Sequence, residues 1–154
     1  MYQHIMVPLD GSELAEGVLP HVETLARGGN VGKVTLVRVV VPLHLYGGIE
    51  SRISPEERQR LEADSMDIAR NYLDQVVKRL TDVGIAAQSE VLYGKVVDKL
   101  ADYADREKVD LIVIATHGRS GASRWVWGSI ANRILRSSSV PVLIVRTHKH
   151  TGAS

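Results

Sequence analysis

The sequence of 154 residues contains no cysteine and no phenylalanine. The absence of cysteine excludes disulfides, thiolate nucleophiles and metal sites built on thiolates. An excess of one charge is also lacking, because 19 basic residues face 18 acidic ones and leave a net charge of +1. Such a chain has no overall field to attract nucleic acid or an anionic membrane, so we expect neither as a partner.

Long hydrophobic runs are absent too, since no apolar stretch approaches the roughly 20 residues that a membrane-spanning helix needs. Residues 1–10 show no basic stretch followed by a long apolar one, so we expect no signal peptide and a cytoplasmic protein. The length suits one domain. We place this domain at residues 1–146 and expect a disordered tail over residues 147–154.

The chain does contain five short apolar segments, rich in β-branched residues, that alternate with helical patterns. We predict strands at residues 5–7, 34–41, 86–92, 111–115 and 140–145. Four of them are nearly continuous apolar runs, which is typical of strands with helices on both sheet faces. The third alternates, with polar Gln88 and Glu90, and therefore suits an edge of the sheet.

Helical patterns fill the intervals at residues 12–26, 54–83, 96–107 and 129–137. Pro20 lies inside the first pattern and is expected to kink or break that helix. The second pattern opens with Ser54 as N-cap, Pro55 in the first turn and Glu57 as the capping-box partner. Gly84 then supplies a stop signal.

This alternation predicts an α/β fold. We expect a single-domain, doubly wound, five-stranded parallel sheet of the Rossmann-like type, with strand order 3-2-1-4-5 and helices on both faces. Such sheets bind ligands beyond the carboxyl ends of their strands, where the strand order reverses. The segments to examine are therefore residues 8–12, 39–41, 93–94 and 115–118.

The segment from Ala115 to Ser129 joins the fourth predicted strand to the last helix. Gly118, Gly121 and Gly128 permit backbone angles closed to other residues and let a ligand approach the main chain. Free N–H groups and the positive end of a helix suit phosphate, and Ser129 at the helix start would cap it or bind a phosphate oxygen. An ordinary connection with glycines for turns is the alternative.

Three segments in this order resemble the universal stress protein family. They are I-M-V-P-L-D-G-S at residues 5–12, A-T-H-G-x9-G-S at residues 115–129 and S-S-V-P-V-L-I-V-R at residues 138–146. The second is similar to the family's nucleotide-binding pattern G-x2-G-x9-G-[S/T], although Ala115 stands in place of the first glycine. The resemblance covers residues 5–146 and is to the members that bind ATP.

The resemblance implies a site for ATP, or for AMP or ADP, with Mg²⁺ held mainly by the phosphates. The implied contacts to adenine and ribose are Asp10 with the backbone around Pro8 and Leu9, together with Val39, Ala115 and His117. The implied contacts to the phosphates, mostly through N–H groups, are Gly118, Arg119, Gly128, Ser129 and Ile130.

We therefore predict a nucleotide-binding sensor or regulator of the stress response rather than a fast enzyme. We assign no catalytic residue and no metal ligand. Slow ATP hydrolysis stays open, but the chain lacks a Walker A pattern and offers only His117 to orient a water. A nucleotide-free dimeric adaptor is the other alternative. Asp10 has a second interpretation, as a turn residue and cap of the first helix.

We also expect a homodimer. The strand from Val140 to Arg146 carries a proline near its start and is expected at a sheet edge. An exposed apolar edge strand is hazardous unless it is covered. Pairing with the same strand of a second copy would cover it symmetrically, and the resemblance implies this mode of assembly.

Overall fold

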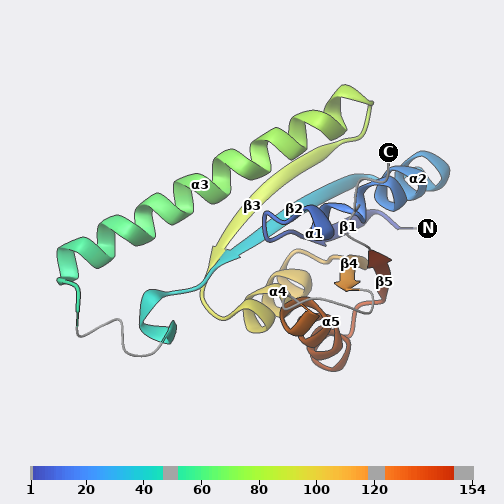
Figure 1. The fold of residues 1–154 in the computed structure, drawn as a ribbon. Helices are drawn as coiled ribbons and strands as arrows, with labels where there is room; N and C mark the ends of the chain where they lie inside the picture. The colour runs from blue at the N-terminus through green and yellow to red at the C-terminus, as the bar shows by residue number, and fades with distance from the viewer. Residues whose placement is uncertain (1, 47–51, 118–123, 148–154) are drawn as a thin grey trace, which may run out of the picture.

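The structure, a computed structural model, describes residues 2–46, 52–117 and 124–147 (Figure 1). In chain order the elements are β1 (His4–Pro8), α1 (Glu13–Glu16), α2 (Leu19–Gly29), β2 (Lys33–Val40), the 3-10 helix η1 (Leu43–Tyr46), α3 (Pro55–Asp82), β3 (Ala87–Tyr93), α4 (Val96–Arg106), β4 (Leu111–His117), α5 (Arg124–Ser137) and β5 (Val142–Thr147).

The strands form one parallel sheet in the order β3-β2-β1-β4-β5. The chain runs outward from β1 to β3 and returns on the other side of β1 through β4 to β5. The central strand is paired on both sides, so that Ile5 lies opposite Val34 of β2 and Leu111 of β4. This order confirms the predicted fold class and places the reversal of strand order at β1 and β4.

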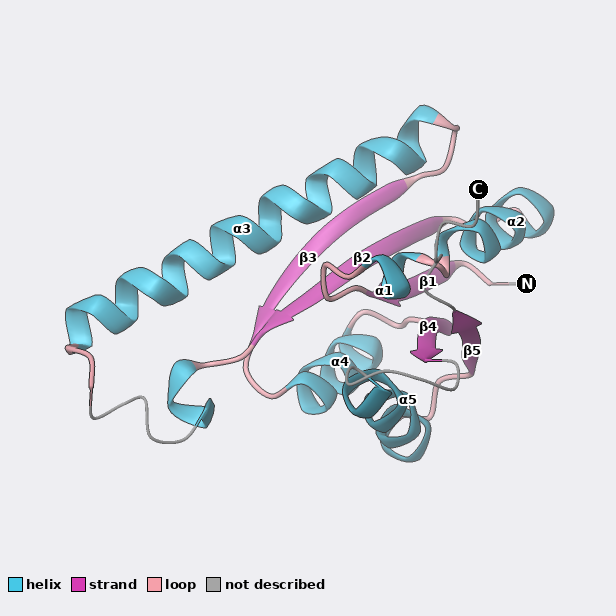
Figure 2. Cartoon of the chain, viewed as in Figure 1, coloured by secondary structure: helices cyan, strands magenta, loops and turns pink. Residues whose placement is uncertain are grey.

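Helices cover both faces of the sheet (Figures 1 and 2). On one face α3 lies along β2 and β3, and α1 lies against α3 through a hydrogen bond from Tyr72 to Glu16. On the other face α4 and α5 pack against each other, α4 over β2 and α5 over β4. The apolar runs of the strands are buried between these layers, and Ile5, Met6 and Val7 of β1 are fully buried.

The first predicted helix is broken, as Pro20 indicates. Its first part, α1, is capped by Ser12 and ends at Gly17, and α2 begins at Leu19 with Pro20 in its first turn. Proline is accepted there because the N–H groups of a first turn have no partner within the helix. The break turns the chain shortly after the loop that leaves β1.

The long helix α3 has 28 residues, begins with the predicted capping box of Ser54 and Glu57, and carries its buried side chains in its second half. These are Ala69, Leu73, Val76 and Leu80. The first half extends past the strands (Figure 1). There Glu62 accepts hydrogen bonds from the Leu43 backbone N–H at 3.1 Å and from the Tyr93 hydroxyl at 2.8 Å. These two bonds join the first half of α3 to the chain segments at the ends of β2 and β3.

Most boundaries differ from the predictions by one or two residues, and the differences around β4, β5 and α5 bear on the site. The strand β4 continues two residues beyond Ala115, because Thr116 and His117 pair with Arg146 and Thr147. Thr147 therefore belongs to β5 rather than to the predicted tail, of which residues 148–154 lie outside the described part. The helix α5 begins at Arg124, so the prediction that Ser129 starts and caps it was wrong.

The amino ends of the strands hold a polar cluster around two buried side chains, His4 and Thr35. His4 is buried; its Nδ1 lies 3.2 Å from the Glu107 carbonyl oxygen, which can only accept, so Nδ1 donates. Nε2 then accepts from the Thr35 hydroxyl at 2.8 Å, and the Thr35 oxygen accepts from Gln88 Nε2 at 3.0 Å. The Asp110 carboxylate accepts the backbone N–H of His4 at 3.0 Å. Burial lowers the pKa of His4, although the backbone hydrogen bond opposes this effect.

Over the residues that the structure describes, no helix combines the length and the apolar character that a membrane crossing requires.

Candidate functional site

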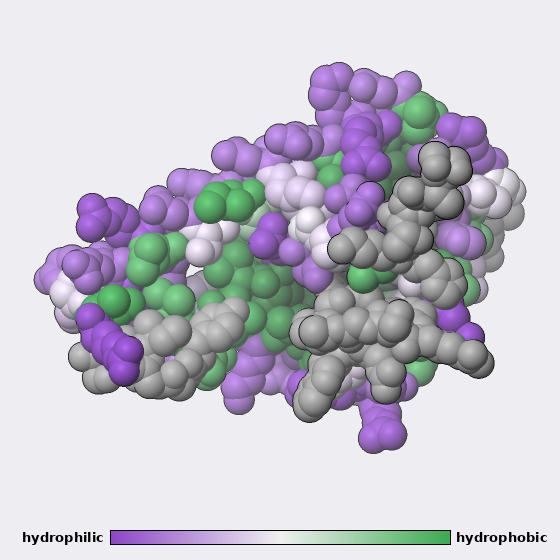
Figure 3. Space-filling view, in the orientation of Figure 1, coloured by the Kyte–Doolittle hydropathy of each residue, from purple (hydrophilic) through white to green (hydrophobic). Residues whose placement is uncertain are grey.

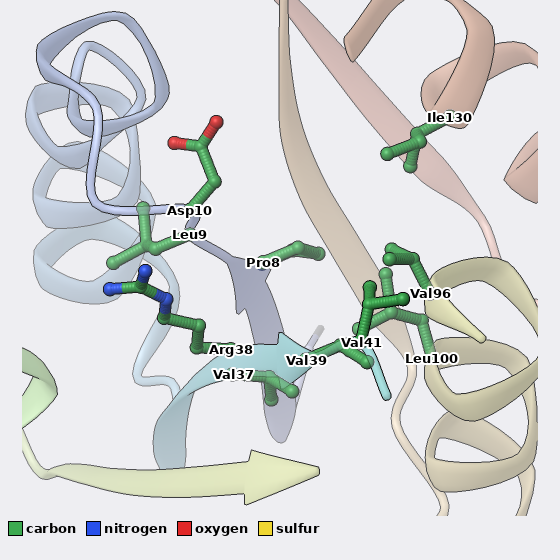
Figure 4. Close-up of a pocket in the computed structure, with 10 residues that line it drawn as sticks. All are labelled: Pro8, Leu9, Asp10, Val37, Arg38, Val39, Val41, Val96, Leu100 and Ile130. Atoms are coloured by element: carbon green, nitrogen blue, oxygen red, sulfur yellow. The ribbon is translucent and has the colours of Figure 1, made fainter. Parts of the chain in front are cut away.

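A cavity of about 220 Å³ opens at the carboxyl ends of β1 and β2 (Figure 4). This is the edge at which a doubly wound sheet offers a ligand site, next to the reversal of strand order. Its walls come from the end of β1 and the following turn, from β2, from α4 and from α5. The lining residues are Pro8, Leu9, Asp10, Val37, Arg38, Val39, Val41, Val96, Leu100 and Ile130.

The turn after β1 has a fixed conformation. The Leu9 backbone N–H donates to the Val37 carbonyl at 2.8 Å, which ties the start of the turn to β2. Asp10 Oδ1 accepts from the Ser12 backbone N–H at 2.8 Å, and Ser12 Oγ accepts from the Ala15 N–H at 3.1 Å. Between them Gly11 has a φ of +89°, which favours glycine.

These bonds bear on the two interpretations of Asp10, as a ligand contact or as a turn residue and helix cap. Asp10 is a turn residue, because its carboxylate holds the Ser12 amide. The cap of α1 is Ser12 and not Asp10. Asp10 also lines the cavity (Figure 4). The same side chain thus shapes the turn and presents a carboxylate to the cavity.

The wall opposite the turn is apolar. Val96 and Leu100 lie four residues apart and face the cavity from one side of α4, and Ile130 faces it from α5 (Figure 4). Val39 and Val41 continue this surface from the end of β2. An apolar cavity with few polar groups at one side suits a flat, largely apolar ring system that carries hydrogen-bonding groups at its edge.

The structure brings five of the predicted site residues together around this cavity: Pro8, Leu9, Asp10, Val39 and Ile130. Ala115 is buried within β4 and is not among the lining residues. His117 is the last residue of β4, and Gly128 and Ser129 lie within α5, Ser129 with an exposed side chain. Gly118 and Arg119, with the rest of the predicted phosphate loop at residues 118–123, lie outside the described residues.

Sequence reasoning missed four lining residues, Val37, Arg38, Val96 and Leu100, whereas Val41 lies in the segment 39–41 that it indicated without assigning the residue a contact. The helical spacing of Val96 and Leu100 behind the strand end at Tyr93 was a signal for the α4 wall. Arg38 was a signal too, because it is a cation within the apolar run at residues 34–41. A polar residue in such a run points to a place where the sheet meets solvent or a ligand.

A second, larger hollow of about 520 Å³ lies on the other side of Arg38, between the end of β2 and α3. Figure 3 shows apolar side chains gathered in this region below α3. Its lining includes Val40, Leu43 and Ile68, and it shares Arg38, Val39 and Val41 with the smaller cavity. Arg38 therefore stands between two adjoining spaces.

Among residues 2–46, 52–117 and 124–147, no group of three or more His, Asp or Glu side chains is placed so that it could hold a metal ion. The polar residues that line the cavity are Asp10 and Arg38, together with the main chain of the turn, and the Arg38 side chain extends toward Leu9 and the turn rather than toward Val96 and Ile130 (Figure 4). This set can bind and orient a ligand through hydrogen bonds.

Solved structures share this architecture. Protein MJ0577 of Methanocaldococcus jannaschii is 27% identical, with a TM-score of 0.80 over 98% of this chain and 99% of that one. A universal stress protein in complex with cAMP is 24% identical, with a TM-score of 0.62 over 94% of this chain and 97% of that one. An Arabidopsis thaliana protein of the universal stress protein family, with AMP bound, is 16% identical, with a TM-score of 0.62 over 99% and 97% of the two chains.

A sequence profile of the universal stress protein family matches residues 1–146, nearly the whole chain. This match agrees with the three segments that resemble the family and with the strand order of the sheet. The chain therefore belongs to the universal stress protein family.

Proposed function

We propose that this protein binds an adenine nucleotide, with ATP as the expected ligand, and acts as a cytoplasmic stress-response sensor or regulator rather than as a fast enzyme. One observation carries the proposal: five residues implied as nucleotide contacts, which come from β1, β2 and α5, surround one cavity. Two neighbours of the same fold, described as complexes with cAMP and with AMP, support adenosine as the shared part of the ligand.

The chemistry of the cavity fits adenosine. A purine ring can pack against the apolar side chains of Val39, Val96 and Ile130, and such packing favours a flat base. The Asp10 carboxylate offers acceptor oxygens to ribose hydroxyls or to the adenine amino group. Since the main chain of Pro8 and Leu9 borders the same space, it adds further hydrogen-bonding groups.

In this proposal the phosphates point toward the segment between β4 and α5. Ala115 and His117 lie at the ribose side, and Gly118, Arg119, Gly128 and Ser129 serve the phosphates. The first turn of α5 follows this segment, and unpaired N–H groups of a helix start favour phosphate. Mg²⁺ would be held by the phosphate oxygens, with no dedicated protein ligand.

We also propose that two copies pair through β5. This strand is at the edge of the sheet, and Leu143 has 37% of its surface exposed. An apolar edge strand of six residues is a template for pairing with another strand. A twofold axis beside β5 would bring identical strands together and remove both edges at once.

The nucleotide proposal is tested by the contents of the purified protein. We expect adenine nucleotide to be released on denaturation and identified by mass spectrometry, and ATP to give a calorimetric binding signal. Val39→Phe fills the cavity and should weaken ATP binding by at least about tenfold. Val83→Phe is the matched control, because Val83 is 45% exposed at the end of α3. Neither released nucleotide nor binding heat from the unchanged protein would contradict the proposal.

A further inference from the structure

Arg38 lies where the second half of β2 meets the turn after β1. It is half-buried, it lines both cavities, and its neighbours along the strand are apolar. In Figure 4 its guanidinium lies on the side of Leu9 and Asp10, across the cavity from Val96 and Ile130. A cation in such a place needs partners that hold it.

One partner is the main chain of the turn. A Cβ placed on Gly11 would lie 3.1 Å from Arg38 Nη1 and 3.6 Å from its Cζ. The guanidinium therefore fills the space beside Gly11 that a side chain would otherwise occupy. The positive φ of Gly11 favours glycine, and the close approach of the guanidinium leaves little room for a Cβ.

The second partner is the ring of Tyr72 on α3. Arg38 Cζ lies 5.6 Å from the centre of this ring, within the range of a cation–π interaction. The guanidinium is thus placed between a glycine of the β1–α1 turn and an aromatic ring of the long helix. Contacts on two sides limit its freedom to follow a ligand.

Tyr72 is itself fixed by α1. Its hydroxyl donates to Glu16 Oε2 at 2.8 Å, and Arg79 Nη1 donates to the other Glu16 oxygen at 2.7 Å. Burial, and then the hydrogen bond to Glu16, raise the pKa of Tyr72. Tyr72 of α3 therefore contacts two neighbouring parts of the chain. Through Glu16 it is joined to the end of α1, and through Arg38 it is joined to the turn that precedes α1.

We propose that Arg38 is a positioning residue of the nucleotide site: held between Gly11 and Tyr72, it fixes the turn at residues 10–12 in the conformation that receives adenosine. This inference rests on the proposed function. Without the guanidinium, the Gly11 main chain would face an empty space, and the Asp10 carboxylate would sample more orientations. Part of the binding free energy would then be spent on ordering the turn.

The alternative role for an arginine at a nucleotide site is direct attraction of the phosphates. The two roles predict different ligand dependence. A positioning residue serves the adenosine end, so its loss weakens ATP and adenosine equally. A phosphate-binding residue affects ATP and leaves adenosine unchanged.

The experiment compares Arg38→Met with Arg70→Met. Methionine keeps an unbranched apolar chain and removes the charged plane. Arg70 is exposed on the same helix as Tyr72 and pairs with Asp67, so its replacement is the matched control. Calorimetry with ATP and with adenosine gives both affinities, urea denaturation checks the fold, and hydrogen exchange of residues 9–15 without nucleotide reports on the turn.

We expect Arg38→Met to weaken ATP and adenosine by the same factor of about ten, the size of one lost interaction of a charged group. Exchange at residues 9–15 should become faster, and Arg70→Met should match the unchanged protein. A loss confined to ATP, or unchanged affinities in a folded Arg38→Met protein, would overturn the proposal. If the unchanged protein binds neither ligand, the proposed function fails. The exchange data then decide whether Arg38 fixes the turn, and unchanged exchange overturns that claim too.

Discussion

The two ends of the parallel sheet are built differently. At the amino ends of the strands, the buried His4 and Thr35 and the exposed Gln88 form a chain of hydrogen bonds. At the carboxyl ends, the Asp10 turn and Arg38 border a cavity. Both ends carry polar and titratable groups, but at the first end the side chains face each other, and at the second they also face a space that a ligand can enter.

The comparison distinguishes polar groups that stabilise the fold from polar groups that are available to bind a ligand. A buried polar cluster whose members satisfy one another stabilises a unique fold and has no group to offer. The groups around the cavity have partners too, as the bond from Ser12 to Asp10 shows. The residues that carry these groups nevertheless border a cavity of about 220 Å³, and a mostly apolar cavity with a few polar residues is typical of binding sites.

The largest effect is expected at the amino ends of the strands, where the polar side chains face one another; we call this the closed end of the sheet, and the carboxyl ends with the cavity the open end. Thr35→Val keeps the shape of a buried side chain and removes the hydroxyl that bonds His4 and Gln88. The free energy of unfolding should fall by about 3 kcal/mol, because the buried side chains of His4 and Tyr103 lose a hydrogen-bond partner, whereas the exposed Gln88 can bond to water instead. Urea denaturation measures this change. ATP affinity should stay within twofold, and a large loss of affinity would break the separation between the two ends.

A lateral edge of the sheet gives the next prediction. Leu143→Lys places a charge at the middle of β5, whose pairing with a second copy we propose. Two copies carry the change, and each should lose about 1.4 kcal/mol of pairing free energy, so the dimer dissociation constant should rise about hundredfold. Analytical ultracentrifugation measures it. Leu135→Lys, at an exposed leucine of α5, is the control. A monomeric unchanged protein at micromolar concentration would end the β5 proposal.

At the open end, Asp10→Asn should reduce ATP affinity by about tenfold with little change in stability. The amide oxygen of asparagine can still accept from the Ser12 N–H, so the turn persists while the charged acceptor is lost. Calorimetry gives the affinity, and Asp82→Asn, in an exposed ion pair of α3, is the matched change elsewhere. Equal affinities for the two variants would mean that Asp10 serves only the turn.

The smallest effect is a dependence of stability on pH. Burial lowers the pKa of His4 below its ordinary value of 6.5. On acidification the unfolded chain therefore takes up a proton before the folded one does. The stabilisation is complete above pH 6.5 and is lost as the pH falls below it. Lys33 adds to the lowering, whereas Asp110 and Glu107 oppose it, so the slope should be shallow.

Urea denaturation between pH 7 and pH 5 tests this dependence. His4→Gln should flatten the curve, and His21→Gln, at an exposed histidine of α2, should not. If the free energy of unfolding of His4→Gln depends on pH as steeply as that of the unchanged protein, the dependence arises from other groups and not from His4.

Most of the fold could be predicted because four strands are runs of apolar residues, which are typical of the interior of a parallel sheet, and the third alternates as an edge strand does. The strand ends could not. Thr116 and His117 extend β4 by pairing with β5, and this pairing depends on the register of a distant segment. The start of α5 was missed for a related reason, because the glycines around residues 118–128 indicate a loop more strongly than Arg124 indicates a helix start.

The candidate site could be predicted on its turn side and not on its wall. Asp10 is recognisable because it follows a strand and precedes a glycine and a serine. Arg38 and Leu100 become neighbours of the cavity only when β2 and α4 meet. The spacing of Val96 and Leu100 indicates an apolar face of α4, but that this face meets β2 at the cavity is a property of the packed molecule.

The long helix α3 has one half packed on the sheet and one half joined to it through Glu62. Opening the first half exposes little apolar surface, whereas opening the second half exposes Leu73, Val76 and Leu80. A continuous helix can therefore fray from its amino end without melting the domain. Both acceptors of the joining bonds belong to the single carboxylate of Glu62, and the bonds from Leu43 and then Tyr93 lower its pKa, so the two links of the first half of α3 would weaken together only on acidification.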